Sequence, residues 1–157
     1  NIEALEHFTG AKFTTAEIVG ADFVLFGDAS RAAMREFHEE LETFVSPLEK
    51  RLKEGSPTLL VGSSYEFFAS RIKGIPDLKF GDRVSEFRTA KSSGFEVKGY
   101  RNSEVLDSDL FISGMFIGTT LFGPVLAKNL DLTEAVAKTL GLDISISADE
   151  RNWIEKL

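Results

Sequence analysis

The 157-residue sequence contains no cysteine and only two histidines, His7 and His38. Without cysteine, the chain forms no disulfide and no thiolate–metal site, and it has no cysteine nucleophile. Two histidines are too few for a histidine-rich metal centre, so we expect no metal site and no cofactor. These absences exclude several common catalytic and metal-binding mechanisms.

Positive charge is also scarce. The chain has 18 Lys and Arg against 25 Asp and Glu, a formal net charge of −7, and the basic run Lys50–Lys53 is flanked by Glu49 and Glu54. Such a surface repels phosphate backbones, so we expect no nucleic-acid partner. No apolar run approaches the length of a membrane-spanning helix and no signal-peptide pattern opens the sequence. We therefore expect no membrane insertion, with the cytoplasm as the default compartment.

The length and composition are those of a globular protein. Hydrophobic residues make up 43% and charged residues 27% of the sequence, and there is no repeat, low-complexity stretch or long linker. We expect a single domain over residues 1–157 with a sizeable core.

The first half of the chain alternates apolar strands with amphipathic helices. Asp22–Phe26 is an apolar run closed by Gly27, which predicts a buried strand. Large apolar residues then recur every three or four positions from Met34 to Leu52, which predicts helix. Pro47 is expected to split this stretch into two helices, and Gly55 to cap the second.

A second apolar strand, Thr58–Val61, breaks sharply at Gly62 into a helical pattern. The resulting strand–helix–strand–helix order predicts an α/β fold with a parallel sheet. A sharp strand-to-helix turn can expose a catalytic nucleophile. Here the tip of the turn is Gly62, which has no side chain.

The second half begins with strands and ends with helices. Arg83–Arg88 and Gly94–Tyr100 alternate in polarity, as half-exposed strands do, and Met115–Leu121 is another apolar strand. Two helices follow. Their predicted capping boxes are Asp131 with Glu134 and Ser147 with Glu150, and Trp153 and Leu157 are expected to pack on the core.

Several of these segments resemble one enzyme family in order and spacing. Met115–Asn129 resembles a signature of the class I glutamine amidotransferases of the cobyric acid synthase type, most closely the glutaminase subunits of lipid II isoglutaminyl synthases. Asn1–Leu5, Pro47–Pro57 and the Gly62 turn match the same family. The resemblance implies a flavodoxin-like three-layer sandwich. The family's first strand would precede Asn1, so we expect either that the given sequence is trimmed or that the sheet is one strand short.

The resemblance also assigns the catalytic positions. In this family a cysteine attacks the side-chain amide of glutamine, and a histidine moves the proton. The cysteine position falls on Gly62 and the histidine position on Phe122, while Asp28 stands in the turn Gly27–Ser30 that would form the oxyanion hole. No part of the catalytic machinery is intact.

The function implied by this resemblance is binding without catalysis. The family's glutaminases work with ATP-using ligases, so we expect a noncatalytic partner or regulator of a Mur-ligase-type synthetase. The remaining binding residues would be Gly27, Asp28, Ser63 and Phe122. Phe122 either fills the space of the lost substrate or lines a remodelled pocket for a small, amino-acid-like ligand.

Two further interpretations concern individual polar residues. Ser63 or Ser64 would make the chain a hydrolase or amidase if a base activated it, although serines at such a turn are more simply helix N-caps. His38 is expected to be solvated. Glu96, Lys98 and Arg101 would bind a small anion or a partner, or be ordinary surface charge, which we favour.

Overall fold

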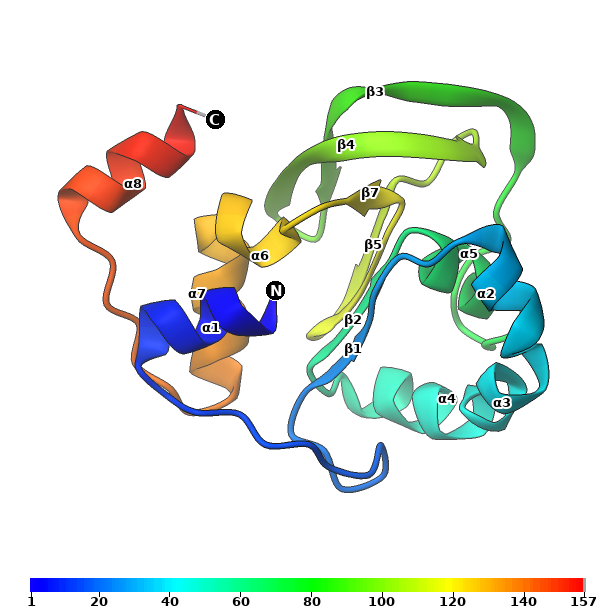
Figure 1. Cartoon of the computed structure of the whole chain (residues 1–157), viewed down its shortest axis with the longest axis horizontal. Coiled ribbons are helices and arrows are strands. Elements are labelled where there is room, and N and C mark those ends of the chain that lie inside the picture. Colours follow the sequence, from blue (N-terminus) through cyan, green and yellow to red (C-terminus); the bar gives the residue numbers. More distant parts are fainter. Residues whose placement is uncertain (157) are drawn as a thin grey trace.

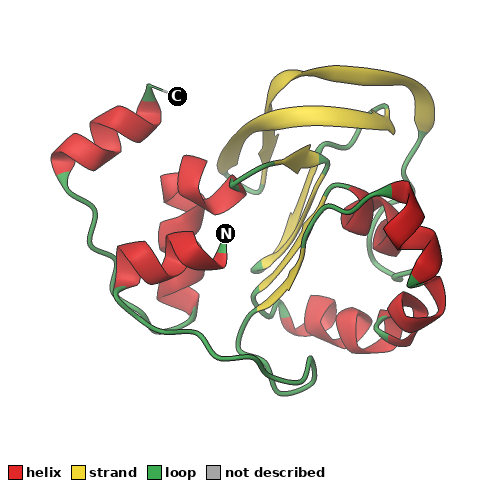
Figure 2. Ribbon diagram, viewed as in Figure 1, coloured by secondary structure: helices red, strands yellow, loops and turns green. Residues whose placement is uncertain are grey.

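A sheet with helices on both faces forms the centre of the protein in a computed structural model that describes residues 1–156 (Figures 1 and 2). A second sheet lies across one end of the first (Figure 1). The predicted α/β fold class is confirmed.

The central sheet has the strand order β1-β2-β6-β5. Its first three strands are parallel, and β5 runs antiparallel to β6 at one edge. The middle strands β2 and β6 are buried at every position, as expected for a parallel sheet covered on both faces. The strands are β1 (Val24–Phe26), β2 (Thr58–Val61), β5 (Leu110–Ser113) and β6 (Phe116–Thr119).

The second sheet is antiparallel, with the order β3-β4-β7. Its strands are β3 (Phe80–Ser92), β4 (Phe95–Val105) and β7 (Leu121–Phe122). The two predicted strands are thus confirmed as a long hairpin. The predicted half-exposure holds for β4, whereas Arg83–Arg88 in β3 is exposed at every residue except the half-buried Val84. The predicted strand Met115–Leu121 is divided, because β6 pairs with β2 whereas β7 pairs with β4.

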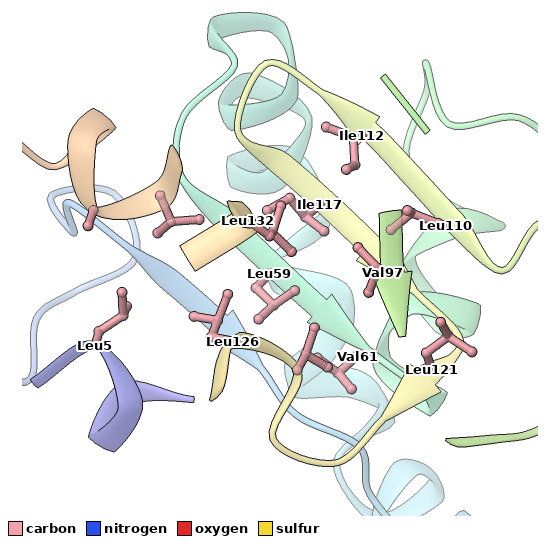
Figure 3. Close-up of a cluster of buried hydrophobic side chains, with 13 residues drawn as sticks. Leu5, Leu59, Val61, Val97, Leu110, Ile112, Ile117, Leu121, Leu126 and Leu132 are labelled. Atoms are coloured by element: carbon pink, nitrogen blue, oxygen red, sulfur yellow. The ribbon is translucent and has the colours of Figure 1, made fainter. Parts of the chain in front are cut away.

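The helices form a layer on each face of the central sheet. They are α1 (Ile2–Thr9), α2 (Arg31–Glu36), α3 (His38–Thr43), α4 (Val45–Glu54), α5 (Ser63–Ala69), α6 (Val125–Lys128), α7 (Leu130–Thr139) and α8 (Ala148–Glu155). The alternation along β2 sets the two cores. Leu59 and Val61 pack with α1, α6 and α7 (Figure 3), whereas Leu60 packs with α4 and α5.

Three predictions about the helices are wrong. The long helical stretch breaks at Phe37 and Phe44 rather than at Pro47, which lies in the first turn of α4, where a missing N–H costs little. Asn129, not Asp131, precedes α7, so the predicted Asp131–Glu134 box does not form. Trp153 is 65% exposed instead of packed on the core, and Leu157 lies outside the described residues.

Other predicted helix ends are confirmed. Gly55 ends α4 in the left-handed conformation with φ +65°, which glycine adopts without strain. Ser147 and Glu150 form the reciprocal capping box that begins α8. Both ends follow from local sequence alone.

Candidate functional site

The carboxyl ends of the parallel strands meet at one edge of the central sheet. In open α/β sheets, ligands bind outside this edge. The turn Gly27–Ser30 follows β1 and Gly62 follows β2, so the structure brings Gly27, Asp28, Gly62 and Ser63 together there. This edge is the candidate site.

Gly62 has the strained backbone of a sharp strand-to-helix turn. Its φ of +60° and ψ of −124° lie in a region of backbone conformation that residues other than glycine rarely adopt. Its N–H donates a hydrogen bond to the carbonyl of Thr119 at the end of β6, 2.8 Å away. The turn that the sequence predicted at Gly62 is therefore confirmed.

The carboxylate of Asp28 occupies the space beside Gly62. It accepts a hydrogen bond from the backbone N–H of Ser63, with 2.9 Å between nitrogen and Oδ1. A Cβ added at Gly62 would lie 2.8 Å from Asp28 Cγ and closer still to its carboxylate oxygen. The position where a nucleophile's side chain would begin is therefore filled.

Ser63 and Ser64 join the two turns of the site rather than cap α5. Ser63 Oγ accepts a hydrogen bond from the N–H of Ala29 at 2.9 Å and donates one to its carbonyl at 3.0 Å. Ser64 Oγ donates to the carbonyl of Gly27 at 2.5 Å. The N-cap of α5 is Gly62, which offers no side chain, so the expectation that the serines are N-caps is wrong.

Within residues 1–156, neither histidine forms a hydrogen bond with Ser63 or Ser64. His7 Nε2 lies 3.0 Å from a carboxylate oxygen of Glu150 on α8. His38 is half-exposed, as expected, and its Nε2 lies 3.2 Å from Nη2 of Arg71. The structure therefore provides no imidazole base for a serine nucleophile.

Phe122 lies in the second sheet, where it packs with other aromatic rings. Its ring meets Tyr100 edge-on with 5.6 Å between centroids, and Tyr100 meets Phe87 at 5.2 Å. Neither cavity described for residues 1–156 is lined by Gly27, Gly62 or Phe122. The contacts of Phe122 place it against Tyr100 in the second sheet and against the core cluster that contains Val61 and Leu121.

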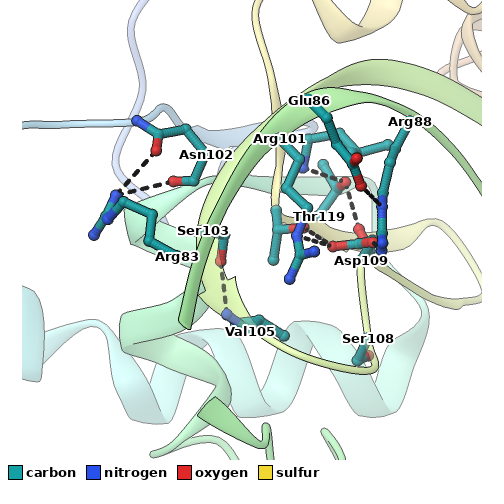
Figure 4. Close-up of polar contacts among 12 residues, drawn as sticks. Arg83, Glu86, Arg88, Arg101, Asn102, Ser103, Val105, Ser108, Asp109 and Thr119 are labelled. Atoms are coloured by element: carbon teal, nitrogen blue, oxygen red, sulfur yellow. Dashed lines mark hydrogen bonds and ion pairs between the residues drawn. The ribbon is translucent and has the colours of Figure 1, made fainter. Parts of the chain in front are cut away.

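A buried ion-pair cluster lies beneath the hairpin (Figure 4). Arg101 is 1% exposed, and its Nε lies 3.0 Å from Asp109 Oδ1. Asp109 also accepts hydrogen bonds from Arg88 Nη1 at 2.9 Å and from Thr120 Oγ1 at 2.5 Å. The hydrogen bond to Asp109 raises the pKa of Arg88. The cluster connects β4 and β3 to the chain around β5 and β6.

The favoured interpretation of Arg101 as ordinary surface charge is wrong. In β4 the odd-numbered residues from Val97 to Val105 are buried, so Arg101 faces inward while Glu96 and Lys98 face outward. Glu96 pairs with Lys91 at 2.9 Å, and Lys98 lines a cavity of about 340 Å³. The alternation of the side chains of β4 between its two faces could therefore have separated the buried Arg101 from the exposed Glu96 and Lys98.

Polar contacts also tie the hairpin to the helices next to the candidate site. Ser103 Oγ on β4 donates to Glu66 on α5 at 2.5 Å. Glu104 accepts hydrogen bonds from Arg83 at 3.1 Å and from Arg31 on α2 at 2.8 Å, and these bonds lower its pKa. The hydrogen bonds of Ser103 and Glu104 therefore hold the hairpin over the carboxyl edge. On the same side of the sheet, burial raises the pKa of the Tyr65 hydroxyl.

Residues 1–156 also lack two features that would point to other functions. This part of the chain holds no group of three or more His, Asp or Glu side chains arranged to bind a metal ion. None of its helices combines the length and apolar character needed to cross a membrane.

Comparison with known proteins gives no assignment. A scan against models of protein families finds no match for this chain, and a search of curated proteins finds no match either. The function is therefore inferred from the geometry of the site and from the resemblance of its motifs.

Proposed function

We propose that the chain is a class I glutamine amidotransferase-like protein that has lost glutaminase chemistry and acts by binding, as a noncatalytic partner or regulator of a Mur-ligase-type synthetase. The observation that carries this proposal is the Gly62 turn. It keeps the backbone shape of a nucleophile turn, while the carboxylate of Asp28 takes the space of the nucleophile. The turn therefore has the backbone conformation of a nucleophile turn but holds no group that can act as the nucleophile.

Each catalytic requirement fails for a separate physical reason. There is no thiol in the chain. During attack on the amide of glutamine, a negatively charged oxyanion would develop beside the carboxylate of Asp28. Repulsion between the two negative charges would destabilise that oxyanion. Both serine hydroxyls near the turn donate to backbone carbonyls, and a serine needs a base to become nucleophilic. No observation in the structure favours the alternative hydrolase or amidase.

The outer face of the hairpin supports a role in binding. Phe87 on β3 is 75% exposed, and its ring meets that of its cross-strand partner Tyr100 with 5.2 Å between centroids. Aromatic side chains are enriched among the residues that anchor protein interfaces. We therefore expect the ligase partner to contact β3.

The loss of chemistry is tested with glutamine. The purified chain is expected to release no ammonia, and neither is the double variant Gly62→Cys, Phe122→His, because Asp28 still occupies the turn. An active glutaminase in the same assay is the control. Steady release by either protein would overturn the loss of chemistry. Labelling by a fluorophosphonate probe that disappears in Ser63→Ala or Ser64→Ala would replace the proposal with a serine hydrolase.

The binding role is tested by co-purification from native extract. A Mur-ligase-type synthetase is expected to accompany the chain, and Phe87→Ser is expected to reduce its recovery. The matched control is Val19→Ser, because Val19 is equally exposed at 77% but lies in the loop before β1. Recovery of no ATP-dependent ligase would refute the binding role.

A further inference from the structure

A cavity of about 340 Å³ lies between the β3–β4 hairpin and the last three helices. Phe87 on β3 and Lys98 on β4 line one wall, and residues of α6, α7 and α8 line the other. We call it the hairpin cavity. Gly62 and Asp28 do not line it, so it is separate from the turn described above. Small-molecule sites measure about 300–1,000 Å³, so the hairpin cavity suits a molecule of amino-acid size.

A buried asparagine holds the two walls of the hairpin cavity together. Asn129 is 6% exposed, and its Oδ1 accepts a hydrogen bond from the N–H of Lys98 at 2.7 Å. Its Nδ2 donates to the carbonyls of Lys98 at 3.0 Å and of Val125 at 2.8 Å. These bonds tie β4 to α6 and to the start of α7. The buried side chains of Leu130 and Ile154 add apolar surface to the lining.

One part of the lining is positively charged. Lys98 comes from β4 and Lys128 from α6, and the Nζ of Lys128 lies 5.7 Å from the centre of the Phe87 ring. Neither lysine takes part in an ion pair within residues 1–156. Glu96 is paired with Lys91 at 2.9 Å, and the attraction of Lys98 lowers its pKa less than Lys91 does. The two lysines therefore leave an excess of positive charge.

Another part of the lining is negatively charged. Arg151 on α8 forms ion pairs with Glu134 and, at 3.7 and 3.9 Å, with Asp131 and Glu155. Asp131 and Glu155 line the hairpin cavity together with Arg151. One guanidinium faces three carboxylates, so this part of the lining keeps an excess of negative charge.

We propose that the hairpin cavity binds a zwitterion of amino-acid size, with its carboxylate beside Lys98 and Lys128, its ammonium beside Asp131 and Glu155, and its apolar part on Phe87. Opposite charges attract over these distances, and hydrogen bonds between ionised groups are the stronger ones. A simple anion would gain from the lysines but would be repelled by the carboxylates, and a simple cation would meet the reverse. Only a ligand with both charges gains from both parts of the lining.

This inference does not depend on the proposed function. It rests on the charges and walls of the hairpin cavity, whereas the proposed function rests on the Gly62 turn and on a ligase that contacts β3. Phe87 belongs to both surfaces, so ligand binding is measured on the purified chain without a ligase. Failure of either test leaves the other proposal standing.

The proposal is tested with three related probes in fluorine NMR titrations. L-4-Fluorophenylalanine carries both charges, its amide derivative lacks the carboxylate, and its N-acetyl derivative lacks the ammonium. The zwitterion is expected to bind saturably, and each derivative at least about tenfold more weakly. No saturable binding of the zwitterion would overturn the proposal. Equal affinity of the N-acetyl derivative would overturn it in favour of a simple anion site.

Variants of the lining test which charge meets which end of the ligand. The double variant Lys98→Gln, Lys128→Gln is expected to weaken binding of the zwitterion by at least about fivefold, and not to weaken binding of the amide derivative, which has no carboxylate. Glu155→Gln is expected to weaken the zwitterion but not the N-acetyl derivative. Circular dichroism selects the variants that fold. Unchanged affinity for the zwitterion in the folded lysine variant would contradict the proposal.

Two controls show whether the hairpin cavity is the place of binding. Lys53→Gln removes an exposed lysine of α4 that does not line the cavity, and it is expected to bind the zwitterion normally. A loss equal to that of the lysine double variant would contradict the proposal. The zwitterion is also expected to shift the amide NMR signals of Gly99 and Leu130 and not that of Gly62. Shifts centred on Gly62 would overturn the proposal in favour of a site at the carboxyl edge.

Discussion

Gly62 and Asp28 form a pair in which one residue's missing side chain leaves room for the other's carboxylate. Gly62 has a positive φ, and the atoms of Asp28 lie where its Cβ would be. The hydrogen bond from Ser63 N–H holds Asp28 in that place. The turn therefore depends on glycine for two reasons, backbone conformation and space.

The double-mutant cycle of these two residues separates the two reasons. Gly62→Ala is expected to destabilise the protein by roughly 1–3 kcal/mol through backbone strain, with a further cost from the contact with Asp28. In an Asp28→Gly background only the strain remains, so we expect a coupling energy of about 0.5–3 kcal/mol. Urea unfolding of the four proteins measures it. Strict additivity would show that Asp28 does not restrict position 62.

Replacing Asp109 is expected to destabilise the protein more than replacing its partner Arg101. Asp109→Ala leaves the charge of Arg101 buried without its closest anion and is expected to cost about 3–5 kcal/mol. Arg101→Met keeps most of the side-chain volume and leaves Asp109 bonded to Arg88 and Thr120, so its cost is expected to be smaller. Urea unfolding compares the two variants. An equal or greater loss in Arg101→Met would contradict the role assigned to this pair.

At the scale of elements, α8 is held by the reciprocal cap of Ser147 and Glu150 and by the contact of Glu150 with His7 on α1. Hydrogen bonds from the hydroxyl and the backbone N–H of Ser147, and one from His7, lower the pKa of Glu150 from its ordinary value of 4.5 to about 2. Ser147→Ala is expected to destabilise α8 by about 1 kcal/mol.

The lowered pKa of Glu150 gives the pH dependence of α8 a definite sign. A carboxylate whose pKa is lower in the folded state stabilises that state fully above its ordinary pKa, and this contribution falls as the pH drops from about 4.5 towards about 2. Glu150→Gln is expected to weaken α8 above this window and to reduce the change within it. Amide exchange in α8 against pH measures both effects, with Glu17→Gln as the control. The same pH profile in Glu150→Gln and in the wild type would refute this origin.

The strands show how far periodicity predicts orientation. The alternation of β4 was recognised from the sequence, and it correctly indicated a half-exposed strand. Arg101 was assigned to the surface because arginine is a charged residue type. Its odd-numbered position in the strand places it on the same face as the buried Val97 and not on the face of Lys98. Pro47 shows the opposite error: its effect on a helix depends on whether it stands in the first turn, which only the observed start of α4 at Val45 determines.

At the scale of the whole molecule, stability is expected to be uneven between the two sheets. The strands β2 and β6 are central and buried at every residue, while β3 is exposed along most of its length. Native-state hydrogen exchange is expected to be slowest for Leu59 to Val61 and faster for the outward-facing amides of β3. Uniform protection of both sheets would show that the hairpin unfolds only with the core.

The position of β7 links the two sheets into one structure. β6 ends at Thr119 in the central sheet and β7 begins at Leu121 in the second sheet, with the buried Thr120 between them. Thr120 donates to Asp109, the partner of Arg101. The chain therefore changes sheets at the residue that joins the ion-pair cluster, and the hairpin is fixed over the carboxyl edge.

The sequence by itself determined the α/β class, the strand at Thr58–Val61, the turn at Gly62 and the absence of a cysteine nucleophile. These features depend on composition and on local periodicity, and both are properties of short segments. Only the tertiary structure decided that Asp28 fills the space beside Gly62, that Ser63 and Ser64 join two turns, and that Arg101 is buried against Asp109. Each of these contacts joins residues from different elements, and their distances depend on how the sheets and helices pack rather than on spacing along the chain.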